Sequence, residues 1–192
     1  MLKANLALEK LISSDAQLIL DIGSGTGEHA QLMSDAGKTV VTNNLYEPAD
    51  VVGDFNQIGF VNSQFDAIWC SHVLEHQPNV NKFLRKCKDV LKDDGILAIT
   101  VPPRKDGIVG GHLTLWNAGL LLYNLIAAGF DCSGASVKTY GYNISVVVRK
   151  KAVPIEVYDK LNMDKGDIEM LAPYFPIPAK QGFNGNIDEV NW

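Results

Sequence analysis

The residues best suited to chemistry form one short segment, in which an acid precedes three glycines at every second position. Asp21 lies inside the apolar run at 18–22, and Gly23, Gly25 and Gly27 follow it. The apolar run predicts a strand buried on both faces, as in parallel sheets. The glycines permit a tight turn and a close approach of a ligand to the backbone. The segment therefore predicts a site for a nucleotide-like cofactor at the carboxyl end of a sheet.

The spacing of the glycines favours a cationic cofactor over a dinucleotide. A dinucleotide-binding turn has glycine at its first, third and sixth positions, with the pyrophosphate on the helix N-terminus. Here the sixth position is Glu28, whose carboxylate would repel a pyrophosphate. Asp21 suits the ammonium and sulfonium charges of S-adenosylmethionine better. A NAD-dependent oxidoreductase is thus the disfavoured alternative, and a structural turn without a ligand is another.

Two histidines are the candidates for a general base, because histidine titrates near neutral pH. His112 lies in the glycine-rich loop at 104–114, on the expected substrate side of the sheet, and is the first candidate. His72 follows the predicted strand at 65–70 and is the second. For His112 the alternative is a loop residue that fixes the next helix; for His72 it is pocket lining.

The remaining polar residues near these candidates have simpler expected roles. We expect His29 to be structural or solvent-facing, and His76 to serve packing or capping. Glu75 is expected to stabilise the start of a helix. Arg104 and Lys105 share the loop of His112 and can hold an anionic substrate group, although solvated surface charges are the default interpretation.

Length and composition fit one globular domain. The chain has 192 residues, of which 46% are hydrophobic, enough to bury a sizeable core. Its net charge of −5 argues against a nucleic-acid substrate, which favours a basic surface. A small-molecule acceptor is therefore the expected partner.

The cysteines and the hydropathy pattern indicate a cytoplasmic protein. Cys70, Cys87 and Cys132 are scattered, odd in number and without a C-x-x-C pair, so we expect free thiols, no disulfide framework and no metal site. No signal peptide opens the sequence, and no apolar run is long enough to span a bilayer. No membrane association is expected.

Strands and helices alternate along the chain, which predicts a parallel sheet with right-handed crossovers. Strands are predicted at 18–22, 39–42, 65–70 and 96–101, and a short apolar piece lies around 51–52. Helices are predicted at 2–12, 28–36, 80–91 and 117–128, and a turn at 93–95. The last two strands, at 135–140 and 144–149, are joined by a short turn and must be antiparallel.

Five segments, in order, resemble the class I S-adenosylmethionine-dependent methyltransferases, in particular a compact group with a V-L-E-H segment after strand four. They are LILDIGSGTG at 18–27, GDF at 53–55, FDAIWCSHVLEH at 65–76, VLKDDGILAITVPP at 90–103 and HLTLWNAGLLLYNLIAAGFD at 112–131. The resemblance covers residues 15–150. It implies an α/β fold with a Rossmann-like, doubly wound seven-stranded sheet of order 3-2-1-4-5-7-6, in which only strand 7 is antiparallel.

The resemblance also implies roles for residues of the cofactor site. Contacts to the methionine half would come from Asp21, Gly23, Gly25 and Gly27. Asp54 would accept from the adenine amine with Phe55 beside the ring, and Ser71 and His72 would lie where the pocket opens toward the methyl group.

One residue departs from the family pattern. Asn44 stands where the family has an acid that binds both ribose hydroxyls. An amide oxygen still accepts hydrogen bonds, but without the strength that a charge adds. Glu47 is near enough in sequence to be an alternative acceptor. The departure keeps open the hypothesis of a non-catalytic binding or regulatory module of the same fold.

The organisation that we predict is an S-adenosylmethionine-binding domain at 1–150 and an ordered extension at 151–192 that packs on it. The extension contains Tyr158, Tyr174, Phe175, Phe183 and Trp192, too many aromatic residues for a disordered tail. It is expected either to cover the acceptor pocket of a monomer or to pack against a second subunit in a homodimer.

The predicted function is in-line methyl transfer to a small or sugar-like acceptor, most simply at oxygen.

Overall fold

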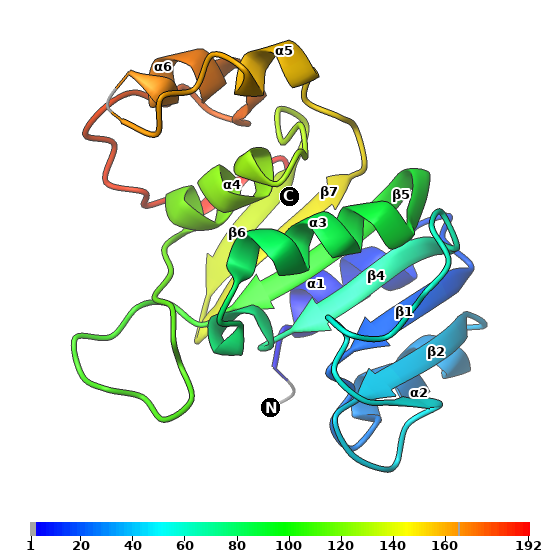
Figure 1. Ribbon diagram of the computed structural model, residues 1–192. Helices are drawn as coiled ribbons and strands as arrows, with labels where there is room; N and C mark the ends of the chain where they lie inside the picture. Colours follow the sequence, from blue (N-terminus) through cyan, green and yellow to red (C-terminus); the bar gives the residue numbers. More distant parts are fainter. Residues whose placement is uncertain (1–2, 165) are drawn as a thin grey trace.

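The computed structural model describes residues 3–164 and 166–192, which form one sheet with helices on both faces (Figure 1). The strands in chain order are β1 (Leu18–Ile22), β2 (Thr39–Asn44), β3 (Val51–Val52), β4 (Phe65–Ser71), β5 (Leu91–Val101), β6 (Ser136–Tyr140), β7 (Asn143–Arg149) and β8 (Glu189–Val190). The helices are α1 (Asn5–Ile12), α2 (Glu28–Asp35), α3 (Val80–Val90), α4 (Ala118–Ala127), α5 (Ile155–Tyr158) and α6 (Asp167–Leu171), with the 3₁₀ turns η1 (Leu74–His76) and η2 (Ala172–Tyr174).

The strand order across the sheet is β3-β2-β1-β4-β5-β7-β6-β8. β1 pairs in parallel with β2 and β4, and β4 with β5, whereas β7 is antiparallel to both β5 and β6. The predicted order 3-2-1-4-5-7-6 with an antiparallel strand 7 is therefore confirmed. The structure adds β8, which pairs with β6 at the edge.

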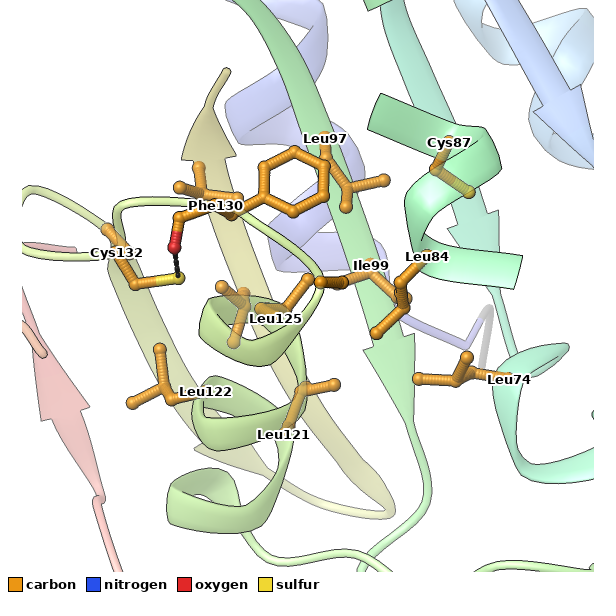
Figure 2. Close-up of a cluster of buried hydrophobic side chains, with 14 of the residues drawn as sticks. Leu74, Leu84, Cys87, Leu97, Ile99, Leu121, Leu122, Leu125, Phe130 and Cys132 are labelled. Carbon is orange, nitrogen blue, oxygen red and sulfur yellow. Dashed lines mark hydrogen bonds between the residues drawn. The ribbon is translucent and has the colours of Figure 1, made fainter. Parts of the chain in front are cut away.

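Two apolar layers hold the helices on the sheet. On one face, α1 and α2 bury Leu8, Leu11 and Met33 against the strands. On the other, α3 and α4 cover β5, and Figure 2 shows side chains from this larger cluster. Those on α3, β5 and α4 include Leu84, Cys87, Leu97, Ile99, Leu121 and Leu125. This packing holds the carboxyl ends of the strands in place, and those ends carry the site.

The three cysteines are free thiols and all are buried. Burial raises the pKa of each thiol, so none of them resembles a reactive thiolate. The Cys132 thiol donates to the Phe130 carbonyl (Figure 2). Among the described helices, none has the length and hydropathy that a membrane crossing requires.

The start of β5 differs from the prediction. The segment at 93–95, expected as a turn before the strand, is an irregular part of β5, where the pairing with β4 shifts from Phe65↔Leu91 to Ala67↔Ile96. Asp94 has a left-handed backbone with φ 62°, and a Cβ at Gly95 would lie 2.8 Å from the Lys92 carbonyl oxygen. The chain thus turns tightly within the strand. Of the helix predicted at 2–12, residue 2 lies outside the described residues.

The last 42 residues run beside α4 and back to the edge of the sheet (Figure 1). Leu171, Phe175 and Ile187 are buried in the same apolar cluster as α4. The Gly119 N–H donates to the Gly185 carbonyl at 2.9 Å, and β8 pairs with β6. The extension therefore contacts α4 and β6, on the side of the sheet away from β1 and β2.

Candidate functional site

A cavity of about 420 Å³ lies at the carboxyl ends of β1, β2 and β4. β1 is the strand at which the order of the sheet reverses, since its neighbours β2 and β4 lie on opposite sides of it. Open α/β sheets bind ligands at such a switch point. The lining includes Gly23, Asn44, Asp54, Phe55, His72 and His76.

The glycine turn is fixed by contacts to two other segments. The N–H groups of Gly23 and Ser24 both donate to the Asn43 carbonyl at the end of β2, at 2.8 and 3.1 Å. Gly23 has φ +75°, and a Cβ there would lie 2.3 Å from Cγ2 of Val73. Glycine is required here because both the backbone conformation and the space exclude a side chain. The turn is thereby held open toward the cavity.

Asp21 is a buried acceptor beneath this turn. The residue is 2% exposed, and its Oδ2 atom has no hydrogen-bond partner among the described residues. Burial raises the pKa of its carboxyl from 3.8 to about 7. A cationic ligand group beside it would favour the ionised form. This unpaired carboxylate fits the positive charge of S-adenosylmethionine.

The adenosine end of the cavity is built from β2 and the loop after β3. The Asn44 side chain donates through Nδ2 to the Tyr46 carbonyl at 3.1 Å, so its amide oxygen is the group that can face a ligand. Glu47 is exposed, accepts from the Ala49 N–H and does not line the cavity. Phe55 is 4% exposed and packs edge-on against Phe83.

Asp54 also lines the cavity, and its carboxylate is partly engaged. Oδ1 accepts from both nitrogens of Asn56, at 2.9 and 3.0 Å, and Oδ2 accepts from the Gln57 side chain at 3.4 Å. These bonds fix the orientation of the carboxylate at the rim of the cavity.

Four of the predicted cofactor residues do not line this cavity: Asp21, which lies beneath the turn, Gly25, Gly27 and Ser71. Gly27 is the N-cap of α2 with φ 83°, and it serves the start of the helix. Ser71 ends β4, and side chains alternate along a strand. Because Cys70 belongs to the core under α3 and α4, Ser71 points to the opposite face of the sheet.

His72 lines the cavity with a ring that is held from both sides. The Asn143 amide is oriented by the Ala4 N–H, which donates to Oδ1, and by its own Nδ2, which donates to the Tyr140 carbonyl. Nε2 of His72, 3.0 Å from Asn143 Oδ1, must therefore be the donor of that pair. Nδ1 lies 3.3 Å from Oε1 of Glu75. Neither ring nitrogen points freely toward an incoming substrate.

Beside His72 lie three residues that we call the Glu75 cluster: Glu75, His76 and His112. Glu75 is fully buried in η1, and its carboxylate oxygens accept no hydrogen bond from the described residues, contrary to the expected helix-start role. His76 is bonded through Nδ1 to the Gly111 carbonyl at 2.7 Å, and its ring meets that of His112 edge-to-face at 5.1 Å. The loop at 104–114 thus brings His112 next to the cavity.

The other polar residues of the predicted site are placed as follows. His29 accepts from the Trp69 indole N–H at 3.2 Å and bonds the Lys3 carbonyl at 3.1 Å, which is a structural role. Lys105 lies over the ring of Tyr142, with its ammonium 4.6 Å from the ring centroid. Arg104 is exposed at the start of the same loop.

Residues 20–99 match a family described as a methyltransferase domain. The ubiquinone biosynthesis O-methyltransferase of Actinobacillus pleuropneumoniae serotype 5b is 32% identical over 100 residues, which cover 41% of this chain and 43% of that protein. The chain thus matches less than half the length of this curated relative.

Solved structures share the fold. A SAM-dependent methyltransferase from Archaeoglobus fulgidus superposes with a TM-score of 0.65 at 15% identity, covering 77% of this chain and 92% of that one. The 1,6-didemethyltoxoflavin-N1-methyltransferase of Burkholderia thailandensis, solved with S-adenosylhomocysteine, gives 0.62 at 17% identity, with 77% and 76% covered.

Proposed function

We propose that this chain is a class I S-adenosylmethionine-dependent methyltransferase that transfers the methyl group to an oxygen of a small-molecule acceptor. The observation that carries the proposal is the unpaired, buried carboxylate of Asp21 beneath a glycine turn that opens into the cavity. Transfer to oxygen is supported by the O-methyltransferases among the relatives.

The chain's residues would hold the cofactor along the length of the cavity. Gly23 would face the methionine end, with the Asp21 carboxylate beneath the turn. Asn44 would face the ribose, and Asp54 with Phe55 the adenine. The bound cofactor supplies a methyl group already activated by the sulfonium charge. The protein's task is then mainly to position the acceptor in line with it, and positioning can supply a large part of the barrier reduction.

On the acceptor side, His112 is better placed than His72 to act on a hydroxyl. Both ring nitrogens of His72 face oxygen acceptors, so His72 orients the wall of the cavity. His112 is partly exposed on the loop that borders this wall. A histidine that accepts the acceptor's proton typically contributes about 10²–10⁴-fold in rate.

The loop also bears on the class of acceptor. Ile108, Leu113 and Leu115 are exposed on or just after it. Exposed apolar side chains beside a cavity favour an acceptor with an apolar or ring-shaped body over a sugar. The acidic net charge of −5 supports a small metabolite over a nucleic acid.

Thermal unfolding in the presence of cofactors tests the proposal first. We expect S-adenosylmethionine and S-adenosylhomocysteine to raise the melting temperature and NAD to leave it unchanged, since a ligand that binds only the folded state stabilises it. A screen of phenolic, hydroxylated and sugar acceptors, read by S-adenosylhomocysteine release, then tests transfer. Stabilisation by NAD alone would overturn the proposal. Cofactor binding without transfer to any acceptor class would favour a non-catalytic module.

A further inference from the structure

The Glu75 cluster has an arrangement of charge that the methyl-transfer chemistry does not explain. Glu75 is fully buried, and neither of its carboxylate oxygens has a hydrogen-bond partner among the described residues. The 3.3 Å contact to His72 Nδ1 and the 3.8 Å contact to His76 Nε2 lack hydrogen-bond geometry. A buried carboxylate needs a countercharge or donors. In the described part of the chain no lysine or arginine pairs with it.

The proton on His76 can be placed from its hydrogen bond. Nδ1 lies 2.7 Å from the Gly111 carbonyl oxygen, which can only accept, so Nδ1 carries the hydrogen. In the neutral ring, Nε2 then presents a lone pair, and this atom faces Oε1 of Glu75 at 3.8 Å. Two acceptors thus face each other across a gap too long for a hydrogen bond. A shared cation would satisfy both.

His112 completes a third side of this gap. The ligand atoms of Glu75, His76 and His112 all lie within 4.8 Å of one another. Metal–nitrogen and metal–oxygen bonds of about 2.0–2.2 Å put two ligands roughly 3.4 Å apart at a tetrahedral angle. Small side-chain rotations would therefore bring the three atoms to bonding distance.

Backbone hydrogen bonds hold the loop of His112 in position. The N–H groups of Leu113 and Thr114 both donate to the Glu75 carbonyl, at 2.8 and 3.2 Å. Gly111 has φ +78°, and a Cβ there would lie 3.0 Å from His76 Nδ1, so only glycine lets its carbonyl approach the ring. A ligand histidine that donates its other ring N–H to a backbone carbonyl is the usual support of a metal site. His76 has that support.

We propose that Glu75, His76 and His112 bind a divalent transition-metal ion, with zinc the best match. Two imidazoles and one carboxylate suit zinc better than magnesium, which prefers oxygen ligands. Three protein ligands leave a position open for water or for another oxygen ligand. The cysteine spacing gave no signal for such a site, because its ligands come from segments far apart in sequence.

The place of the cluster suggests what the open position would bind. His76 also lines the cofactor cavity, so an ion here would lie between that cavity and the loop at 104–114. If the proposed function holds, an acceptor oxygen would occupy the open position and be oriented toward the methyl group. His112 would then act as a ligand and not as a free base.

Metal binding by the full chain, without cofactor or acceptor, tests the site directly. Protein stripped with a chelator is titrated with Zn²⁺ by calorimetry and with Co²⁺ by visible absorption, with Mg²⁺ as a separate arm. We expect about one Zn²⁺ or Co²⁺ per chain and the absorption of a low-symmetry Co²⁺ site. Mg²⁺ should bind at least about tenfold more weakly.

Matched variants separate this site from general binding to histidine. His112→Asn removes a partly exposed ligand, and Glu75→Gln keeps the size of the side chain while removing its charge. Each should weaken Zn²⁺ binding by at least about tenfold. His29→Gln, which removes a histidine outside the cluster, should leave it unchanged. Circular dichroism checks that each variant is folded.

Three outcomes would overturn the proposal. The first is that folded wild-type protein binds no Zn²⁺ at concentrations below about 100 µM. The second is that His112→Asn binds Zn²⁺ as tightly as wild type. The third is that His29→Gln loses as much Zn²⁺ affinity as the variants of the cluster. Because no methyl acceptor is present, failure of the proposed function cannot produce any of these results.

Discussion

The two halves of the carboxyl edge of the sheet are built in different ways. The cofactor half, at β1, β2 and β4, is formed by strand ends and one glycine turn whose N–H groups bond directly to Asn43. The half where we propose that the acceptor binds, called the acceptor half, lies beyond β5. It depends on the loop at 104–114 and lies near an extension that packs on α4. The first is specified by local sequence and close backbone packing, the second by side chains brought together from distant segments.

The strongest test of this contrast is Gly23→Val. The left-handed backbone would cost about 1–2 kcal/mol in a residue with a Cβ. The collision with Val73 would add about 1–3 kcal/mol. We expect a large loss of stability in urea unfolding and no detectable binding of S-adenosylmethionine by calorimetry.

Gly25→Ala is the matched control for Gly23→Val. Gly25 also has positive φ, but a Cβ there meets nothing within 4 Å. Gly25→Ala should lower the free energy of unfolding only by the cost of the left-handed backbone, about 1–2 kcal/mol. Equal losses in both variants would show that the packing of Gly23 against Val73 is not what shapes the turn.

Leu171→Ala tests the acceptor half and the extension. Leu171 is fully buried in the cluster that includes α4, and removing such a side chain costs about 2–5 kcal/mol. We expect this loss of stability in urea unfolding, with an unchanged Kd for S-adenosylmethionine because the extension contacts α4 and β6. Ile155→Ala, at a side chain 67% exposed, should change stability by less than about 0.5 kcal/mol. A Kd that weakened together with stability would show that the two halves are coupled.

Asp21→Asn tests the buried charge through its pH dependence. The pKa of Asp21 is raised to about 7 in the folded protein, so between about pH 4 and 7 the folded state binds a proton that the unfolded state has released. Stability contributed by this group therefore falls as pH rises through that range and is constant above it. The penalty at pH 8 is of order 4 kcal/mol at most.

Asp21→Asn should remove the stability penalty of the buried charge and weaken the binding of S-adenosylmethionine. Urea unfolding at pH 8 should find Asp21→Asn more stable than wild type by up to a few kcal/mol, with the difference shrinking toward pH 4. Calorimetry should show weaker binding of S-adenosylmethionine, and affinity should rise with pH through about 7 in wild type only. A stability difference that did not depend on pH would mean that Asp21 is not the group that titrates.

The same contrast decides what the sequence could predict. The strand order was predicted through the family resemblance of five ordered segments. The glycine turn was predictable because Asp21 and its glycines lie within a few residues of the strand that positions them. The Glu75 cluster could not be predicted, because His112 is held near Glu75 by the hydrogen bonds from the Leu113 and Thr114 N–H groups to the Glu75 carbonyl. Likewise, the donor on His72 depends on Asn143, which is 71 positions away. The irregular start of β5 depends on the crowding of Gly95 against its neighbours.

Asn44→Asp carries the smallest expected effect and tests the departure from the family pattern. Asn44 lines the cavity, and a carboxylate there would accept with the added strength of a charge. Hydrogen bonds to charged groups are stronger than neutral ones by about 0.5–1.5 kcal/mol, so the Kd for S-adenosylmethionine should tighten by about 2–10-fold in calorimetry.

Two further variants are the controls. Asn44→Ala should weaken binding of S-adenosylmethionine, and Glu47→Gln should not change it, because Glu47 lies outside the cavity lining. If Asn44→Asp weakened binding as Asn44→Ala does, the ribose would not lie against β2. If Glu47→Gln weakened it instead, the exposed loop carboxylate would be the acceptor, and this end of the cofactor half would depend on a loop side chain, as the acceptor half does.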